Sequence, residues 1–154
     1  MNVKLNGILF LMLQVIIIYS ACNNADKNDI KSLEPLAEKA YHNEDYSKSL
    51  DLYTKITLLD STNALYFFRK GVSNAHLLKH AEAILDLKKS FDLDGGSAHT
   101  FFDIALEYKH LGFFDSTILY LQKSLALDSS NNRAKDIIEE CELFLKLDKR
   151  LNNK

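Results

Sequence analysis

The chain has 154 residues, of which 47% are hydrophobic, and this content suits one domain with a core and excludes a disordered polar protein. Its 19 Lys and Arg residues and 21 Asp and Glu residues give a formal net charge of −2, so the basic excess of a nucleic-acid-binding protein is missing. One proline and five glycines favour helices joined by short turns, and we expect an all-α fold.

The N-terminal segment is typical of a secretion signal. Lys4 precedes an apolar run from Ile8 to Tyr19, and two small residues then lead to Cys22. As a helix this run spans about 18 Å, well short of the roughly 30 Å hydrocarbon core of a bilayer. We therefore predict that residues 1–21 are a signal peptide that is cleaved.

The residues YSAC at 19–22 resemble the lipobox of bacterial lipoproteins, whose cysteine accepts a diacylglycerol and becomes the new N-terminus. The resemblance implies a lipid on Cys22 and a polar tether at 22–29 between membrane and domain. Tyr19 stands where such boxes usually have an aliphatic residue, so an uncleaved anchor and an ordinary secretory signal stay open as alternatives. Because Asn23 follows the cysteine, and not aspartate, we expect an outer-membrane lipoprotein that faces the periplasm.

From residue 30 onward one pattern recurs at an interval of 34 residues. The stretches KITLLDSTN, KSFDLDGGS and KSLALDSSN begin at Lys55, Lys89 and Lys123. Small side chains recur in the same register and would let two helices approach within about 8 to 10 Å. We therefore predict that each unit is a pair of packed helices. The small residues are Ala37, Gly71 and Ala105 in the first helices and Ser49, Ala83 and Thr117 in the second.

Polar breaks in the sequence set the expected helix limits. We expect Tyr46, His80 and Phe114 to open the second helices. Ser32 is expected to cap the first helix of the chain, with Pro35 in its first turn. The predicted first helices are near 32–42, 64–77 and 98–111, and the second helices near 46–59, 80–93 and 114–127.

This pattern closely resembles the tetratricopeptide repeat, a 34-residue helix-turn-helix unit. Such units stack into a right-handed superhelix with a concave groove. The resemblance therefore implies an all-α, right-handed α-solenoid. It covers residues 30–131, as three repeats at 30–63, 64–97 and 98–131. The proline that commonly closes such a repeat is replaced by Ser61, Gly95 and Ser129, and the glycine between the two helices survives only as Gly112.

Residues 132–154 are predicted to be a capping helix and tail. Their amphipathic pattern suits a helix that covers the last apolar face of a stack of repeats. Cys141 lies on the apolar stripe of this helix with Ile137 and Ile138, so we expect it in the core. A reactive thiol is the less favoured alternative, because three neighbouring glutamates supply negative charge where thiolate chemistry needs positive charge.

The sequence shows no established pattern of catalytic or cofactor-binding residues. His76 and His80 have the spacing of metal ligands on one helix, but the repeat register puts a turn between them, so we expect no metal site. His42, His76 and His110 recur 34 residues apart, and we interpret them as polar residues near helix ends that interact with the helix dipole. GVSNA at 71–75 lacks the second glycine of a nucleophile elbow. We expect no cofactor and no enzyme activity.

The resemblance implies a scaffold that binds peptide segments with the groove-facing residues of its first helices. The chaperone-binding members of the family clamp a peptide carboxylate with Lys, Asn and Arg. Here acidic side chains and His99 stand at matching places, so we expect no carboxylate clamp. The groove-facing residues implied by the register are Glu34, Glu38, Tyr41, Phe68, Arg69, Val72, Phe102, Asp103, Leu106 and Lys109.

We therefore predict a non-enzymatic adaptor that is anchored to a bacterial cell-envelope membrane through Cys22 and that binds another protein in its groove. The alternative is a structural packing or dimerisation subunit of an envelope assembly without a peptide ligand, so a homodimer stays open. An enzyme of unrecognised type is the third hypothesis. Substitutions in the groove would disrupt an adaptor, whereas substitutions on the capping helix or the convex face would disrupt a packing subunit.

Overall fold

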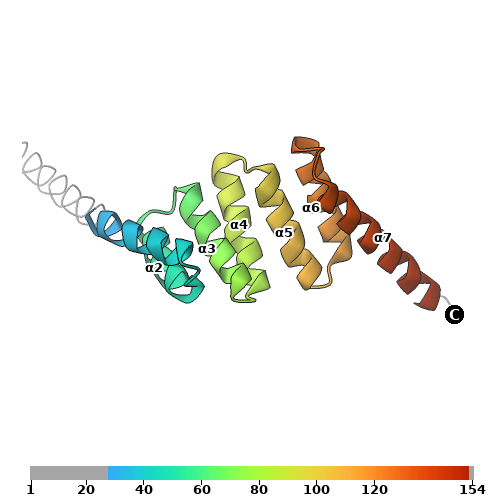
Figure 1. Ribbon diagram of the computed structural model, residues 1–154, viewed down its shortest axis with the longest axis horizontal. Coiled ribbons are helices and arrows are strands. Elements are labelled where there is room, and N and C mark those ends of the chain that lie inside the picture. Colours follow the sequence, from blue (N-terminus) through green and yellow to red (C-terminus); the bar gives the residue numbers. More distant parts are fainter. Residues whose placement is uncertain (1–27, 153–154) are drawn as a thin grey trace, which may run out of the picture.

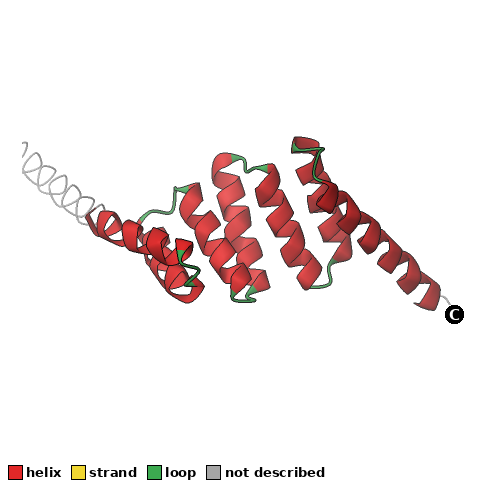
Figure 2. Cartoon of the chain, viewed as in Figure 1, coloured by secondary structure: helices red, strands yellow, loops and turns green. Residues whose placement is uncertain are grey.

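The computed structural model describes residues 28–152, and every regular element among them is a helix (Figures 1 and 2). The predicted signal peptide, Cys22 and most of the expected tether lie outside this part of the chain. Within it, no helix has both the length and the apolar character needed to cross a bilayer. A first helix at 28–42 is followed by α2 (Tyr46–Leu59), α3 (Ala64–His76), α4 (His80–Asp94), α5 (Ala98–His110), α6 (Phe114–Leu127) and α7 (Asn132–Asn152).

The helices pack in chain order into one elongated stack. Each helix from α2 to α6 contacts the next one along the chain, and α3 also contacts α5. Figure 1 shows the helix at 28–42 at one end of the stack and α7 at the other. The prediction of an all-α solenoid is confirmed, and the three second helices begin at the aromatic and histidine residues expected to open them.

The recurring aspartate of the 34-residue pattern forms the turn between repeats. In each copy its Oδ1 accepts a hydrogen bond from the backbone N–H two residues further on. The side-chain oxygen thus takes the place of the backbone carbonyl that closes an ordinary turn. The bonds join Asp60 to Thr62 at 2.8 Å, Asp94 to Gly96 at 2.8 Å and Asp128 to Ser130 at 3.0 Å.

Three residues after that aspartate, a second polar side chain caps the helix that follows. Its oxygen accepts from a backbone N–H in the first turn, which would otherwise have no partner in the helix. Asn63 accepts from Leu65 at 3.0 Å, Ser97 from Thr100 at 3.2 Å and Asn131 from Ala134 at 3.1 Å. The recurring stretch therefore ends one repeat and starts the next with its own side chains.

The recurring small residues are buried at the contacts between helices, as predicted. Gly71 of α3 is the tightest of these contacts. A Cβ atom at this position would lie 2.9 Å from Cγ of Leu87 and 3.1 Å from the backbone nitrogen of Leu87. The backbones of α3 and α4 can approach this closely only because residue 71 has no side chain.

The first helix starts earlier than expected. It includes residues 28 and 29 of the expected tether, and both Ser32 and Pro35 lie inside it. Ser32 Oγ donates to the carbonyl oxygen of Asp29 at 2.8 Å, so the prediction that Ser32 caps this helix is wrong. The reason is tertiary packing. Ile30 and Leu33 pack against a buried cluster that includes Tyr53 and Ile56, and this burial favours continued helix despite the proline.

The capping helix α7 covers the last repeat as expected. Its side of the core consists of Ala134, Ile137 and Cys141, which are buried against Ala105 and Leu121 of the third repeat. The interpretation of Cys141 as a core residue is confirmed. Burial raises the pKa of its thiol, so the reactive thiolate is disfavoured there.

Candidate functional site

Rings at the helix ends pair from each repeat to the next. His76 stacks on Tyr46 with 3.9 Å between ring centroids, and His110 stacks on His80 at 4.8 Å. Phe144 of α7 meets Phe114 at 4.4 Å. His76 and His110 thus each pack on the residue that opens the preceding second helix, a contact that the helix-dipole interpretation did not include. In residues 28–152 no three His, Cys, Asp or Glu side chains gather in a way that could hold a metal ion.

A pocket of about 280 Å³ lies between α3 and α5, with one wall on α4, and we call it the central pocket. Three of the predicted groove residues, Val72, Asp103 and Leu106, meet here. The other residues that line it were not predicted as site residues. They are Ala75, His76, Leu87, Glu107 and His110.

Asp103 is the chemically distinctive residue of the central pocket. Its carboxylate forms no hydrogen bond or ion pair with any side chain that the structure describes, whereas its neighbour Glu107 lies 2.6 Å from Nδ1 of His80. Burial raises the pKa of Asp103 to about 6; His99 opposes this shift and Glu107 adds to it. The pocket therefore offers an apolar patch of Val72, Leu87 and Leu106 beside a carboxylate that pairs with no described side chain.

Replacing Asp103 by asparagine should stabilise the fold at pH 7 and leave it unchanged near pH 3.5. In the folded chain the pKa of Asp103 is raised, so its ionisation opposes folding. This penalty is absent below the pKa of the unfolded chain, grows as the pH rises and is complete above about 6. Because the side chain is partly exposed, we expect a gain of about 1 to 2 kcal/mol in the free energy of unfolding at pH 7.

Urea denaturation of Asp103→Asn and of the wild-type chain at pH 3.5, 5 and 7 would measure this difference. The exposed Asp92 of α4 supplies the matched control, since Asp92→Asn should shift stability little at any of these pH values. A difference between Asp103→Asn and wild type that stays constant with pH would contradict a raised pKa.

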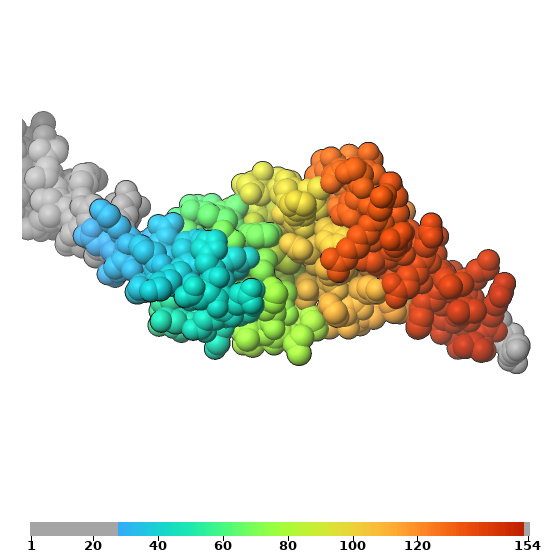
Figure 3. All heavy atoms as spheres, viewed as in Figure 1, coloured from blue at the N-terminus to red at the C-terminus, as the bar shows by residue number. Residues whose placement is uncertain are grey.

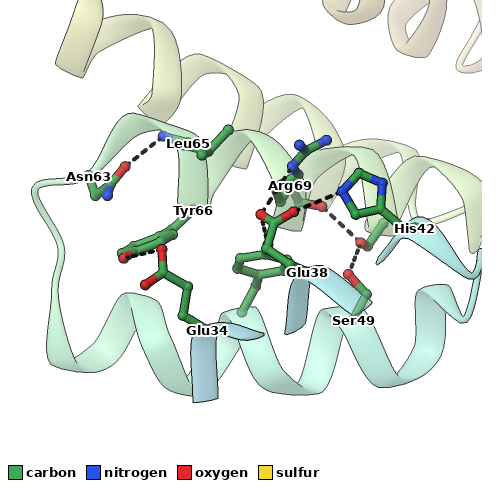
Figure 4. Close-up of polar contacts among 10 residues, drawn as sticks. Glu34, Glu38, His42, Ser49, Asn63, Leu65, Tyr66 and Arg69 are labelled. Atoms are coloured by element: carbon green, nitrogen blue, oxygen red, sulfur yellow. Dashed lines mark hydrogen bonds and ion pairs between the residues drawn. The ribbon is translucent and has the colours of Figure 1, made fainter. Parts of the chain in front are cut away.

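The predicted groove residues nearest the N-terminal end form hydrogen bonds and ion pairs with one another and with neighbouring tyrosines (Figure 4). Tyr53 Oη donates to Oε1 of Glu38 at 2.5 Å, and Nε of Arg69 lies 3.5 Å from the same oxygen. The Arg69 guanidinium also lies 4.1 Å from the centroid of the Tyr41 ring. Tyr66 Oη donates to Glu34 at 3.1 Å, and burial raises the pKa of Tyr66 to about 12. These side chains join the first and second repeats and are not free for a ligand.

The remaining predicted residues are also separated from the central pocket. Lys109 donates to Glu140 of α7 at 2.7 Å. Phe102 packs against the buried cluster of the third repeat, with Arg133 5.4 Å from its ring centroid. Phe68 lines a different pocket, of about 250 Å³, beside the turn from α4 to α5. The structure thus brings three of the ten predicted residues together and places the others in contacts between repeats or at separate places.

Comparison with known proteins gives distant relatives and a shared fold. No family model matches the chain. It is 26% identical over 108 residues to mouse sperm-associated antigen 1, which covers 70% of this chain and 12% of that protein. The human protein of that name is 23% identical over 122 residues, covering 79% of this chain and 13% of its own length. The chain thus spans about an eighth of these relatives.

Solved structures with the same architecture include tetratricopeptide-repeat domains and a secretion chaperone. The TPR domain of P58(IPK) has a TM-score of 0.75 at 20% identity, over 82% of this chain and 35% of that one. The second TPR domain of human RPAP3 was solved with the HSP70 peptide SGPTIEEVD. It has a TM-score of 0.67 at 19% identity, and the match covers 76% of this chain and 98% of that one. The Yersinia enterocolitica secretion chaperone SycD was solved with a peptide of the translocator YopD. It has a TM-score of 0.68 at 16% identity, and the match covers 75% of this chain and 94% of that one. The chain has the fold of a tetratricopeptide-repeat domain.

Proposed function

We propose that this protein is a non-enzymatic adaptor that holds a basic segment of another protein at its central pocket. The observation that carries the proposal is the Asp103 carboxylate, which is partly buried beside apolar side chains and forms no hydrogen bond or ion pair with a described side chain. A lysine or arginine side chain suits such a site, because its apolar stem can lie along Val72 and Leu106 while its charged end reaches the carboxylate.

The solved relatives support the general role of the fold and show how this chain differs. RPAP3 and SycD were each solved with a peptide, so this architecture binds peptides in other proteins. The RPAP3 peptide ends in EEVD, which contains three acidic residues. The central pocket here carries the unpaired carboxylate of Asp103, whose negative charge would repel such a peptide and attract a basic one.

Binding of synthetic peptides to the full-length protein in detergent tests this function. Fluorescence anisotropy would compare nine-residue peptides with lysine, arginine, norleucine or glutamate at the central position of one apolar framework. We expect the two basic peptides to bind at least tenfold more tightly than the norleucine peptide, and the glutamate peptide to bind most weakly. Binding of the basic peptides should weaken as the pH falls through about 6, because Asp103 then becomes protonated.

Two variants locate the effect. Asp103→Asn should remove the preference for basic peptides, whereas Asp92→Asn, which changes an exposed carboxylate of α4 outside the pocket, should keep it. Equal affinity of the wild-type chain for the basic and glutamate peptides would overturn the proposed partner chemistry.

We further propose that a lipid on Cys22 anchors the adaptor to a bacterial cell-envelope membrane, most simply the outer membrane on its periplasmic side. The support is the sequence of residues 1–22, with a short apolar run followed by a lipobox-like motif. A membrane tether would hold a peptide-binding domain close to the surface at which its partner works, and it would raise the effective concentration of both.

Replacing Cys22 by alanine should release the protein from the membrane fraction, because the only proposed lipid attachment is lost. Cys141→Ala should remain in the membrane fraction, because Cys141 lies in the core of the domain. Fractionation of cells that produce each variant, followed by a carbonate wash, measures the difference. A Cys22→Ala protein that still sediments and keeps residues 1–21 would instead favour an uncleaved anchor.

A further inference from the structure

The second half of α7 extends past the stack and exposes a row of large apolar side chains. The residues of α7 that are buried, Ala134, Ile137 and Cys141, all lie in its first half. In the second half Phe144 is 52% exposed, Leu147 47% and Leu151 71%. Figures 1 and 3 show α7 projecting at the C-terminal end of the molecule. A free helical end of about ten residues is marginal in water, so these side chains indicate a surface that another element covers.

A third pocket lies at the base of this row. It has a volume of about 480 Å³ and is formed where α7 passes the end of α5 and the start of α6. Phe144 and Leu147 form part of its lining, together with Leu143, Phe114 and Cys141. The apolar row therefore continues into a hollow large enough for side chains of a second helix.

The charges of α7 indicate which helix could pack against this apolar row. The first half of α7 carries four acidic residues, Asp136, Glu139, Glu140 and Glu142, against two basic ones, Arg133 and Lys135. The second half reverses this balance, with Lys146, Lys149 and Arg150 against Asp148. A second α7 that ran parallel would put like charges together. A second α7 that ran antiparallel would put the acidic half of each helix beside the basic half of the other.

We propose that the protein forms a two-fold dimer in which α7 of one copy packs antiparallel on α7 of a second copy. With Phe144 of each copy against Leu147 of the other, Arg150 comes within about one helical turn of Glu139 of the second copy. Such an interface uses the same patch on both copies, as a closed two-fold contact requires. The contact lies at the end of the stack, so it is independent of the peptide proposed for the central pocket.

The mass of the full-length protein in detergent, measured by light scattering over a range of concentrations, tests the dimer. Wild type is expected to be dimeric, and Leu147→Asp should raise the dissociation constant at least tenfold. Leu58→Asp is the matched control, because Leu58 of α2 is 81% exposed near the other end of the stack, and it should leave the dimer intact. A monomeric wild type, or equal effects of the two substitutions, would overturn the proposal.

Charge exchange tests the antiparallel arrangement. Arg150→Glu and Glu139→Arg should each weaken the dimer several-fold, because each places like charges together. The double variant should recover most of the wild-type affinity, since each exchanged residue again faces its opposite charge in the second copy. Circular dichroism checks that all variants keep their helices. A double variant as weak as the single ones would exclude the antiparallel pairing of Arg150 with Glu139.

Discussion

Replacing Gly71 by leucine should unfold the middle of the stack. Even a Cβ atom at this position lies too close to Leu87, and a larger side chain must force α3 away from α4. Overpacking of a core typically costs about 1 to 3 kcal/mol, and we expect the upper end because a backbone nitrogen, which cannot rotate away, is among the contacts. Urea denaturation followed by circular dichroism should show a lower midpoint and, because repeats support their neighbours, loss of helicity beyond α3 and α4.

A matched glycine separates overpacking from a change in backbone preference. Gly95 has a φ of +82° and open space around its Cα, so Gly95→Ala should cost only the strain of a left-handed residue, about 1 kcal/mol. Gly71→Ala should cost less in a Leu87→Ala background than in wild type, because the side-chain part of the contact is then absent. An unchanged midpoint for Gly71→Leu would show that the contact between α3 and α4 is misplaced.

Replacing Lys70 by methionine should cost about 3 kcal/mol, because it removes the cation from a nearly buried carboxylate. Asp86 is buried and accepts from Lys70 Nζ at 2.9 Å and from Asn74 Nδ2 at 2.8 Å. Without Lys70 the carboxylate keeps only the amide of Asn74 as a partner. Thermal or urea denaturation of the variant measures the loss.

The size of this effect depends on burial, which two further variants test. Lys55 lies 2.7 Å from Asp51 in an exposed pair, so Lys55→Met should cost less than about 0.5 kcal/mol. In the double variant Lys70→Met/Asp86→Asn the buried group is neutral and can still accept from Asn74, so stability should return most of the way to wild type. If the double variant were as unstable as Lys70→Met, loss of packing by the lysine stem would explain the result, and not the unpaired charge.

Most of the fold could be predicted because the sequence repeats its own boundary signals. The aspartate and the capping residue recur every 34 residues, and each acts on backbone groups only two or three residues away. Such local chemistry can be recognised in one sequence. The start of the first helix could not, because its extension past Ser32 depends on packing of Ile30 and Leu33 against α2 and α3.

The candidate site was harder to predict. The repeat register indicates on which face of a helix a residue lies, but it does not indicate which side chain that residue contacts. Glu38 and Arg69 hold each other across two repeats, and Lys109 is held by Glu140 of the capping helix, which has no repeat equivalent to align with. Asp103 remains available because the residues around it include no cation that reaches it. The contribution of His76 and Glu107 to the pocket could have been suspected from their place on α3 and α5, but only the packing of these helices shows it.

Because the turns between repeats are closed by local side chains, a whole repeat can be added to the stack without a new boundary signal. Because each boundary is closed by its own aspartate and capping side chain, a further copy of residues 64–97 inserted after residue 97 would bring both signals with it. It would also supply a histidine to stack on the His80 before it and a new His80 for the next first helix, as His110 stacks now. The protein could therefore grow by whole repeats in evolution or by design, which would lengthen the distance between the helix at 28–42 and α7 while both ends stay as they are.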